Sequence, residues 1–599
     1  MSKRIIKKVA VLGSGVMGSR IAGHFAGIGL QVLLLDIVPA EAKDSTDKVQ
    51  RNKIVNSSLE AALKSNPSPV FTKEVAKRIT TGNFDDNLKE ISGYDWVIEV
   101  VVERLDIKQA LYEKVEQHRK PGTLITTNTS GIPIHLLTEG RSEDFKKHFC
   151  GTHFFNPPRY LRLLEVIPSP ETSPEVVDFL LHYGDLYLGK TTVLAKDTPA
   201  FIANRIGVFG IMAIFGAIEK LGLTIDEVDA LTGPIIGRPK SATFRTADVV
   251  GIDTLVNVAK GVAENCTEDE QRAVFQIPSW LTKMVENKWL GDKTGQGFFK
   301  KIKGEKGEKE ILTLNLQTLE YAPRQKAKFA SVDAAKAVDD LKQRLKMLVS
   351  GQDKAGEFYR QFHYGLFSYI SHRIPEISDE VYRIDDAMKA GFGWEIGAFE
   401  SWDVLGVERT AKAAKEAGYS IAPWVEEMLA AGNKTFYKVE GGKTLVYDPS
   451  AKQYKAVPGS DAFIILSNYS DKLVWKNNSS RVYDIGDGVL GLQWSTKMNT
   501  MGGDVLTGIS KAIELAEKDH KGLVIANEGG AFSAGANVGM IFLFAIEQEW
   551  DELDMAIRLF QNTMMRCRYS AVPVVVAPHG LALGGACEMS LHSDKVCAA

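Results

Sequence analysis

A histidine and a glutamate near the ends of predicted strands could together take a proton from an alcohol. His153 lies in the segment GTHFFNPP and Glu165 in LLEV. Oxidising an alcohol requires a base for the hydroxyl proton while a hydride leaves carbon, and an imidazole, whose ordinary pKa is about 6.5, suits this task near neutral pH. A carboxylate beside the ring would set its tautomer. Taken alone, each residue is more often a packed or solvated side chain.

A glycine-rich turn supplies a site for the hydride acceptor. Gly13, Gly15 and Gly18 form GSGVMG directly between a predicted strand and a helix, and Asp36 ends the next strand. The glycines permit a tight turn, close approach of a pyrophosphate and close helix packing, while the acid can accept from both ribose hydroxyls. Since IVP rather than an arginine follows Asp36, the sequence predicts NAD rather than NADP. A structural glycine turn is the alternative, which the strand, spacing and acid disfavour.

The elements that would position these groups read as alternating strands and helices. Residues 5–36 form one strand, turn, helix and strand, and further strands are expected at 94–101, 123–128 and 161–167. Such alternation predicts an α/β fold with a mostly parallel, doubly wound sheet, which we expect to occupy residues 1–195. Open sheets of this kind bind ligands at the carboxyl ends of their strands.

Six motifs in order carry a resemblance to a known family. GSGVMG, VVERLDIK, NTS, HFFNPP, LLEV and DTPAFIANR, which cover residues 5 to about 300, together resemble the 3-hydroxyacyl-CoA dehydrogenases of fatty-acid β-oxidation. The resemblance implies a Rossmann-like domain, NAD as cofactor and oxidation of a (3S)-3-hydroxyacyl-CoA thioester to 3-oxoacyl-CoA. It makes His153 the general base and Glu165 its orienting partner, with Ser130 and Asn204 at the substrate's hydroxyl and thioester region.

The same resemblance places three more side chains along the cofactor, namely Glu103, Lys108 and Asn156. Other readings stay open: Ser130 and Asn156 could cap or turn the backbone, and Asn204 could hold a helix start. The family has serine after NTS where this chain has Gly131, a departure at a flanking position.

Long apolar periodicities predict a helical domain at residues 196–300, followed by a connecting segment at 301–354. The charged run at 297–309 predicts a solvated turn or hairpin rather than a basic binding patch. A pairing of TFRTADVVG (Phe244, Asp248, Gly251) with AFESWDVLG (Phe399, Asp403, Gly406) indicates a second, degenerate helical copy at 355–435. The family's helical domain usually dimerises, and our hypothesis is that this second copy takes the partner's place.

After a linker at 436–475, with strand-like pieces KTLVYDP and AFIILSN, a new unit is expected at 476–599. It reads as strand RVYDIGDGVLGLQW, a helix, strand GLVIANEG, a Gly/Ala loop, a helix, strand VPVVVAPHG and the glycine run LGGACE.

Two loops of this last unit, AFSAGAN and HGLALGGACE, resemble the oxyanion-hole segments of the crotonase, or enoyl-CoA hydratase, family. The resemblance implies the amides of Ala536 and Gly585 as donors, each worth about 10² to 10³ in rate. Glu588 matches one of two hydratase glutamates, although a helix N-terminal carboxylate is the simpler reading. The other glutamate would follow Ala599, so we expect a partial crotonase-like ββα spiral that cannot hydrate an enoyl-CoA.

Composition excludes some classes of partner. The formal charge of -3 gives no excess positive field for nucleic acid, and no run approaches the roughly 20 apolar residues that cross a bilayer. Five cysteines without paired spacing predict no metal site and no disulfide framework, which fits a reducing, cytoplasmic location. A homodimer or a thiolase complex is compatible with this reading. The competing functions are a dehydrogenase with a non-catalytic crotonase-like scaffold and a structural, crystallin-like protein.

Overall fold

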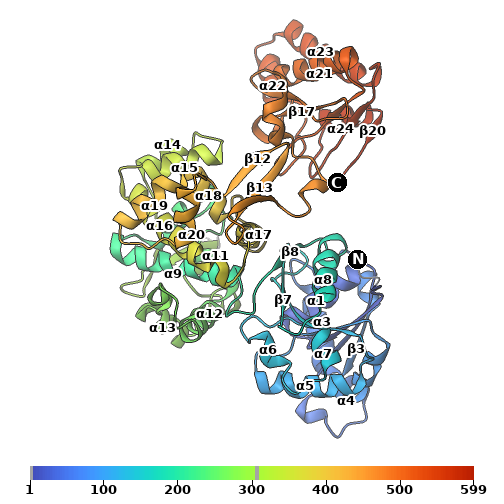
Figure 1. The fold of residues 1–599 in the computed structure, drawn as a ribbon, viewed down its shortest axis with the longest axis vertical. Coiled ribbons are helices and arrows are strands. Elements are labelled where there is room, and N and C mark those ends of the chain that lie inside the picture. The colour runs from blue at the N-terminus through green and yellow to red at the C-terminus, as the bar shows by residue number, and fades with distance from the viewer. Residues whose placement is uncertain (1–3, 304–308) are drawn as a thin grey trace. The chain divides into compact units, whose positions relative to one another are not determined.

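The computed structural model describes residues 4–303 and 309–599. The chain divides into two compact units, which we describe separately (Figure 1): Met1–Phe436 with Asp448–Gln453, and Tyr437–Tyr447 with Tyr454–Ala599. No helix in these described ranges is long and apolar enough to cross a membrane.

The first unit begins with an eight-stranded sheet of order β3-β2-β1-β4-β5-β6-β7-β8. Every neighbouring pair is parallel except β6 and β7, which confirms the mostly parallel, doubly wound prediction. Three strands, β3, β6 and β8, lie outside the expected set. The strands are β1 (Lys8–Leu12), β2 (Gln31–Asp36), β3 (Ile79–Asn83), β4 (Trp96–Glu99), β5 (Leu124–Thr127), β6 (Phe149–Phe154), β7 (Leu163–Pro168) and β8 (Thr191–Leu194).

One core cluster joins this sheet to helices α1 (Val16–Gly27) and α8 (Pro174–Leu186). The Phe25 ring of α1 lies 5.1 Å from that of Trp96 on β4, and Trp96 lies 5.9 Å from Tyr183 on α8. The strands are apolar along nearly their whole length because helices cover the sheet. A third helix, α5 (Leu105–His118), lies between β4 and β5 in the chain.

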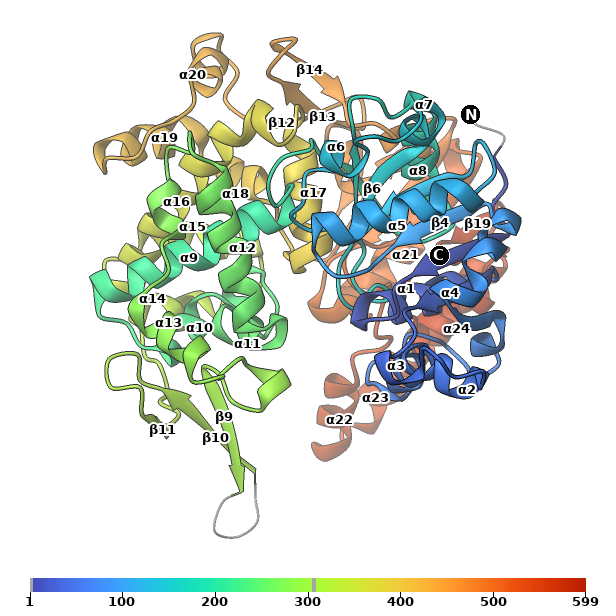
Figure 2. The same ribbon diagram turned by 90° about the horizontal axis from the view of Figure 1, so that it is seen from below.

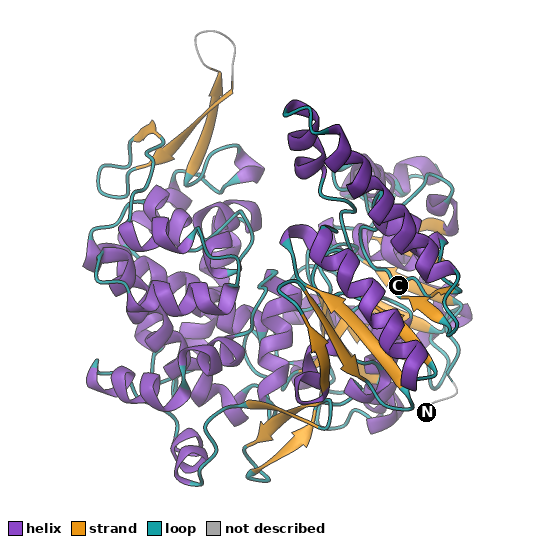
Figure 3. Cartoon of the chain, turned by 90° about the horizontal axis from the view of Figure 1, so that it is seen from above, coloured by secondary structure: helices purple, strands orange, loops and turns teal. Residues whose placement is uncertain are grey.

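The middle of the first unit is helical, as predicted (Figure 3). Its first helices are α9 (Ala203–Leu221), α10 (Ile225–Leu231), α11 (Phe244–Val250), α12 (Ile252–Asn265) and α13 (Ser279–Glu286). The charged run then forms the antiparallel pair β9 (Phe299–Lys303) and β10 (Lys309–Leu314), seen at the lower edge of Figure 2. The turn expected between these strands lies at 304–308, outside the described residues.

The segment expected only to connect the helical copies has secondary structure of its own. It contains β11 (Tyr321–Pro323), α14 (Ala330–Ala335) and α15 (Leu341–Ser350). The second copy then consists of α16 (Lys354–Glu376), α17 (Val381–Phe392), α18 (Ala398–Leu405), α19 (Val407–Glu416) and α20 (Pro423–Ala430).

The two paired motifs adopt the same local structure. Gly251 (φ +103°) joins α11 to α12 and Gly406 (φ +85°) joins α18 to α19, in a backbone region that L side chains rarely adopt. Asp248 accepts from the backbone N–H groups of Phe298 and Phe299, and Asp403 from that of Phe436 at 2.7 Å. Each aspartate thus links its short helix, α11 or α18, by hydrogen bonds to a segment near the end of the same helical copy.

The copies pack directly on one another through α9 and α16, which lie side by side, and through α17 (Figure 2). A Cβ added at Gly207 of α9 would lie 2.0 Å from Cζ of Phe392 on α17, so only glycine leaves room for that ring. The second copy therefore forms part of the core around α9 rather than a separate appendage.

The second unit contains two sheets. The shorter one consists of β12 (Tyr437–Glu440), β13 (Lys443–Asp448) and β14 (Gln453–Ala456). The six-stranded sheet follows chain order and consists of β15 (Leu473–Lys476), β16 (Ser480–Asp484), β17 (Val489–Trp494), β18 (Gly522–Ile525), β19 (Val574–Val576) and β20 (Lys595–Val596). The helices of this unit are α21 (Gly503–Asp519), α22 (Val538–Ile546), α23 (Trp550–Arg568) and α24 (Gly585–Leu591).

Two local predictions for this unit were wrong. AFIILSN is not a strand: Phe463 and Ile464 are 60% and 53% exposed, and the residues on either side form 3-10 turns, so the apolar run has no sheet to pack in. RVYDIGDGVLGLQW is a hairpin of β16 and β17 rather than one strand, because Gly486 (φ +95°) and Gly488 (φ +78°) turn the chain between them.

Candidate functional site

The three glycines of the first turn differ in what surrounds them. A Cβ at Gly13 (φ +109°) would lie 2.6 Å from the carbonyl oxygen of Val100, and one at Gly18 would lie 1.8 Å from that of Gly13. A Cβ at Gly15 would meet nothing within 4 Å. The outer glycines therefore permit the turn and the close helix, while the middle one leaves an open face at the start of α1. This cradle fits a pyrophosphate on the helix N-terminus.

Asp36 lies at the end of β2 against this turn. Its Oδ2 accepts from the backbone N–H and the hydroxyl of Ser14, both at 2.6 Å, and its Oδ1 accepts from the N–H of Ile37 at 2.7 Å. Across the same turn, Arg20 of α1 donates to Oδ1 of Asn156 at 2.6 Å, so Asn156 lies beside the dinucleotide helix. The predicted cofactor residues Gly13, Gly15, Gly18, Asp36 and Asn156 therefore converge on the carboxyl end of the sheet.

His153 and Glu165 face each other across β6 and β7, the antiparallel pair of the sheet, where they are direct partners in register. Nδ1 of His153 lies 2.7 Å from Oε2 of Glu165. The histidine is 6% exposed and the glutamate fully buried. Because Nδ1 is engaged, Nε2 is the nitrogen left for another molecule, and it bonds to no residue in the described part of the chain.

The other oxygen of Glu165 binds the start of α9. Oε1 accepts from the backbone N–H groups of Ile202 at 3.1 Å and Ala203 at 2.8 Å, so every side of the buried carboxylate is engaged. Just before Ile202, the residue that precedes α9, Ala200 (φ +64°) and Phe201 (φ +50°) are both left-handed, which strains residues other than glycine. The Phe201 ring lies 5.7 Å from that of His153. Asn204, in the first turn of α9, follows directly.

Glu103 organises the loop that carries Ser130. It accepts from the backbone N–H groups of Ser130 at 2.9 Å and Gly131 at 3.0 Å, and from the hydroxyl of Thr129. Burial acts to raise the pKa of Glu103, but Lys108 and these hydrogen bonds hold that pKa below its usual value. The carboxylate is thus held ionised beside the Ser130 loop.

Lys108 is itself buried, 1% exposed, and its ammonium lies 2.7 Å from Glu99 and 3.4 Å from Glu103. Our sequence analysis missed Glu99, which ends β4 and also accepts from Tyr112 and Thr127. Its position at the carboxyl end of a parallel strand, just before VVERLDIK, was the available signal. These contacts fix the ammonium of Lys108 in place.

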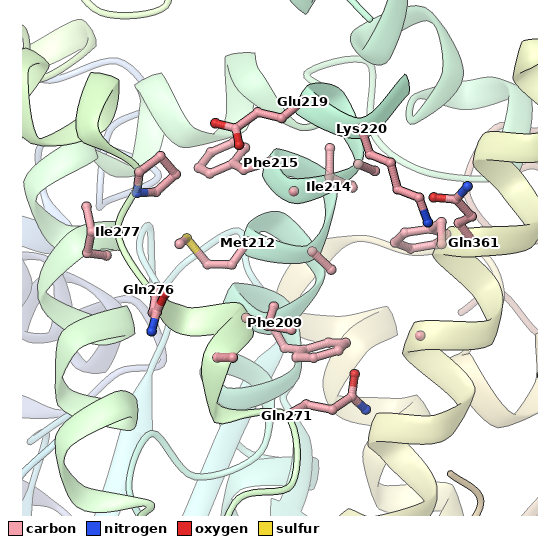
Figure 4. Close-up of a pocket in the computed structure, with 18 of the residues that line it drawn as sticks. Phe209, Met212, Ile214, Phe215, Glu219, Lys220, Gln271, Gln276, Ile277 and Gln361 are labelled. Atoms are coloured by element: carbon pink, nitrogen blue, oxygen red, sulfur yellow. The ribbon is translucent and has the colours of Figure 1, made fainter. Parts of the chain in front are cut away.

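One cavity of the first unit lies away from these residues. It measures about 530 Å³ and lies along the second half of α9, between the segment at 271–279 and α16 (Figure 4). Phe209, Met212 and Phe215 contribute apolar side chains, and Gln271 and Gln361 contribute amides. None of the predicted site residues lines it.

In the second unit, the two predicted oxyanion-hole loops lie side by side. Ser533 donates its N–H to Leu581 at 3.0 Å, and Leu583 donates back to Ser533 at 3.1 Å. The backbone N–H groups of Ala536 and Gly585 donate to no other described residue. Glu588 is an exposed acid in the first turn of α24, which also fits a carboxylate that interacts only with the N-terminus of its helix.

Comparison with known proteins identifies two family domains. The model described as "3-hydroxyacyl-CoA dehydrogenase, NAD binding domain" matches residues 8–198, and that described as "3-hydroxyacyl-CoA dehydrogenase, C-terminal domain" matches residues 201–301.

Similar proteins extend over nearly the whole chain. A "Probable 3-hydroxyacyl-CoA dehydrogenase" of Bacillus subtilis (strain 168) is 43% identical over an alignment of 606 residues, gaps included, that covers 99% of this chain and 76% of that protein. A "Putative fatty acid oxidation complex trifunctional enzyme" of Rickettsia felis is 32% identical over 99% of this chain and 77% of its own length. The crystal structure of 3-hydroxybutyryl-CoA dehydrogenase from Escherichia coli K12 matches with a TM-score of 0.51 at 23% identity, over 72% of this chain and 99% of that one, which shows the shared fold.

Proposed function

The chain belongs to the 3-hydroxyacyl-CoA dehydrogenase family of NAD-dependent oxidoreductases, and we propose that its own residues oxidise a (3S)-3-hydroxyacyl-CoA to the 3-oxoacyl-CoA as follows. The observation that carries the proposal is the buried contact of 2.7 Å between His153 and Glu165. It leaves one imidazole nitrogen available on the first unit, which also contains the dinucleotide turn.

The glycine turn, Asp36 and Asn156 would hold NAD, which when bound supplies the hydride acceptor. Gly15 leaves the backbone open to the pyrophosphate, and Asp36 presents its carboxylate to the ribose hydroxyls. Glu103 and Lys108 would lie along the nicotinamide end, held rigid by Glu99 and the Ser130 loop.

His153 would take the proton of the 3-hydroxyl at Nε2 as the carbon loses its hydride. Glu165 accepts the Nδ1–H and stabilises the imidazolium that forms, so the proton moves without leaving an isolated buried charge. Ser130 and Asn204 would hold the hydroxyl and the thioester carbonyl in line with the ring. Asn204 suits this role because it lies one residue after the Ala203 N–H that binds Glu165.

For the second unit we propose that the amides of Ala536 and Gly585 bind a thioester oxygen of an acyl-CoA. Their support is that both N–H groups lack an acceptor among the described residues and sit on adjoining loops. A non-catalytic scaffold is the second candidate, favoured by the exposure of Glu588. Because we expect no hydration by this chain, enoyl-CoA hydration that Glu588→Gln abolishes would show catalysis. Failure of the second unit to bind an acyl-CoA would support the scaffold.

A cytoplasmic location and assembly as a homodimer or with a thiolase stay predictions. The second helical copy packed on α9 supports a chain that does not need a partner's helical domain. Light scattering coupled to size exclusion would test this: one chain per particle would support the hypothesis that the second copy takes the partner's place, and two chains would support the homodimer.

The decisive experiment is NADH formation across 3-hydroxyacyl-CoA chain lengths, in wild type and His153→Ala. Loss of a general base should lower kcat by about 10² to 10⁴. His182→Ala, at an exposed histidine of α8, is the matched control and should match wild type. Full activity of His153→Ala would instead point to another base, whereas no NADH formation by the wild type at any chain length would favour the structural, crystallin-like alternative.

A further inference from the structure

A buried cluster of charges joins the first turn of α9 to the end of α16. Arg205 of α9 is fully buried and donates to Asp269 at 2.6 Å, to Glu376 at 2.9 Å and to the hydroxyl of Tyr369. Arg373 of α16 donates to the same Asp269 at 2.9 Å and lies 2.7 Å from Glu376. The two copies are therefore linked by paired charges one residue after Asn204.

The two arginines of this cluster act on the buried carboxylate of Asp269. Burial acts to raise the pKa of Asp269, yet Arg373 and Arg205 beside it hold that pKa below its usual value. Two donor groups of the arginines in this cluster, Nη1 of Arg205 and Nε of Arg373, are buried without an acceptor among the described residues. Unsatisfied donors of this kind reduce stability, so stability alone is a poor explanation for the cluster.

The end of α16 also binds the chain just before α9. The ammonium of Lys196 donates to the carbonyl of Pro375 at 2.7 Å and to Asp379 at 2.6 Å, and its backbone N–H donates to the carbonyl of Ile377 at 3.0 Å. Residues 196–205 are thus held at both ends by one short stretch of the second copy, residues 373–379.

Between these two attachments lie the groups that orient the proposed base. Ala200 and Phe201 are left-handed, and the N–H groups of Ile202 and Ala203 bind Glu165. Two adjacent residues in a strained conformation persist only where the surroundings hold them. Released at either end, the segment would relax and turn its N–H groups away from Glu165.

We propose that the end of α16, through Arg373 and Glu376, is a positioning device for the dehydrogenase site: it holds residues 196–205 so that Glu165 and His153 stay aligned. The proposal rests on the function proposed for His153. It gives the second helical copy a role in the reaction although none of its side chains touches the substrate. Arg373 and Glu376 are positioning residues in this scheme.

The test uses the full chain with Glu376→Gln and Arg373→Met. Each should lower kcat by about tenfold to a hundredfold, the effect of a displacement near 1 Å at a reacting group, while KM for NAD stays at the wild-type value. Arg373→Lys, which keeps the charge, should recover part of the loss. The control is Asp292→Asn, which weakens a bidentate but partly exposed pair with Arg245 away from residues 196–205 and should keep wild-type kcat.

Wild-type kcat in Glu376→Gln and Arg373→Met, with or without a lower Tm, would overturn the proposal. Should those variants fail to fold, Lys196→Met decides, because that side chain is 42% exposed and its loss leaves the buried cluster intact. A several-fold lower kcat would support the proposal and an unchanged kcat would refute it. If His153→Ala is fully active, the role proposed for His153 is wrong; if it is inactive while these variants are normal, only the positioning role fails.

Discussion

Replacing Glu165 by glutamine should invert the tautomer of His153. The carboxylate accepts from three N–H groups, two on the backbone of Ile202 and Ala203 and one on the imidazole. A glutamine has one carbonyl oxygen and one NH₂ group in the same volume. With its oxygen on the backbone pair, its NH₂ faces Nδ1, so the neutral imidazole must carry its proton on Nε2 and cannot act as a base there.

The opposite orientation of the amide would restore the active tautomer but would leave two buried backbone N–H groups without an acceptor. Each such group costs about 1 to 3 kcal/mol, so the active orientation lies about 2 to 6 kcal/mol higher. At 1.36 kcal/mol for each power of ten in rate, kcat should fall by about 30-fold to about 10⁴-fold. Binding of NAD should not change, because Glu165 does not contact the glycine turn.

The assay is steady-state NADH formation with the 3-hydroxyacyl-CoA that the wild type oxidises fastest, together with Tm and the Kd for NADH. Glu175→Gln, at an exposed glutamate in the first turn of α8, is the matched control. A Glu165→Gln variant with wild-type kcat and Tm would refute the reasoning, since the tautomer of His153 would then not matter.

Three further outcomes follow from packing and titration. Burial lowers the pKa of His363 from 6.5 to about 4, so between these pH values the unfolded chain binds a proton that the folded chain does not bind. The free energy of unfolding should therefore fall by up to about 3 kcal/mol as the pH decreases from 6.5 to about 4. His363→Gln should remove this pH dependence, measured by urea unfolding. Gly207→Ala should destabilise by about 1 to 3 kcal/mol, and adding Phe392→Leu should recover part of that in a double-mutant cycle. Asp248→Ala removes the acceptor of two buried backbone N–H groups and should lower the free energy of unfolding by about 2 to 6 kcal/mol, measured by denaturant titration.

The dinucleotide turn was predictable because its causes are local. Strand, glycines, helix and the acid of the next strand lie within residues 5–36, and the spacing alone assigns each glycine a steric role. In the structure, Gly13 and Gly18 have crowded surroundings and Gly15 faces open space, as this spacing requires. Likewise, the left-handed Gly251 and Gly406 follow from two short motifs read side by side.

The pairing of His153 with Glu165 depended on long-range strand order that periodicity does not reveal. Neither β6 nor its antiparallel direction was expected from the residues, and the partnership came from the family resemblance. Glu99 was missed for a similar reason. From the sequence alone, Glu99 at the end of WVIE is expected to be a solvated residue at a strand end. Only the structure shows that Lys108, Tyr112 and Thr127 surround it.

The second helical copy shows where a duplicated domain can diverge. The offset along the sequence that aligns Gly251 with Gly406 also aligns Asn204 with Tyr359 and Arg205 with Arg360. Tyr359 is buried and donates to the carbonyl of Leu231, and Arg360 binds backbone carbonyls rather than acids.

The second copy therefore has the corresponding helices and the aspartate that accepts from a backbone N–H group, but it lacks the asparagine that we propose contacts the substrate. Arg373 and Glu376, which grip the first copy, lie more than three turns further along α16, on a stretch that the paired motifs do not cover. Because that contact joins one copy to the other, comparing the copies with each other could not reveal it. A domain that lost its own site can thus still act on the reaction by holding residues 196–205 of its neighbour in a strained form.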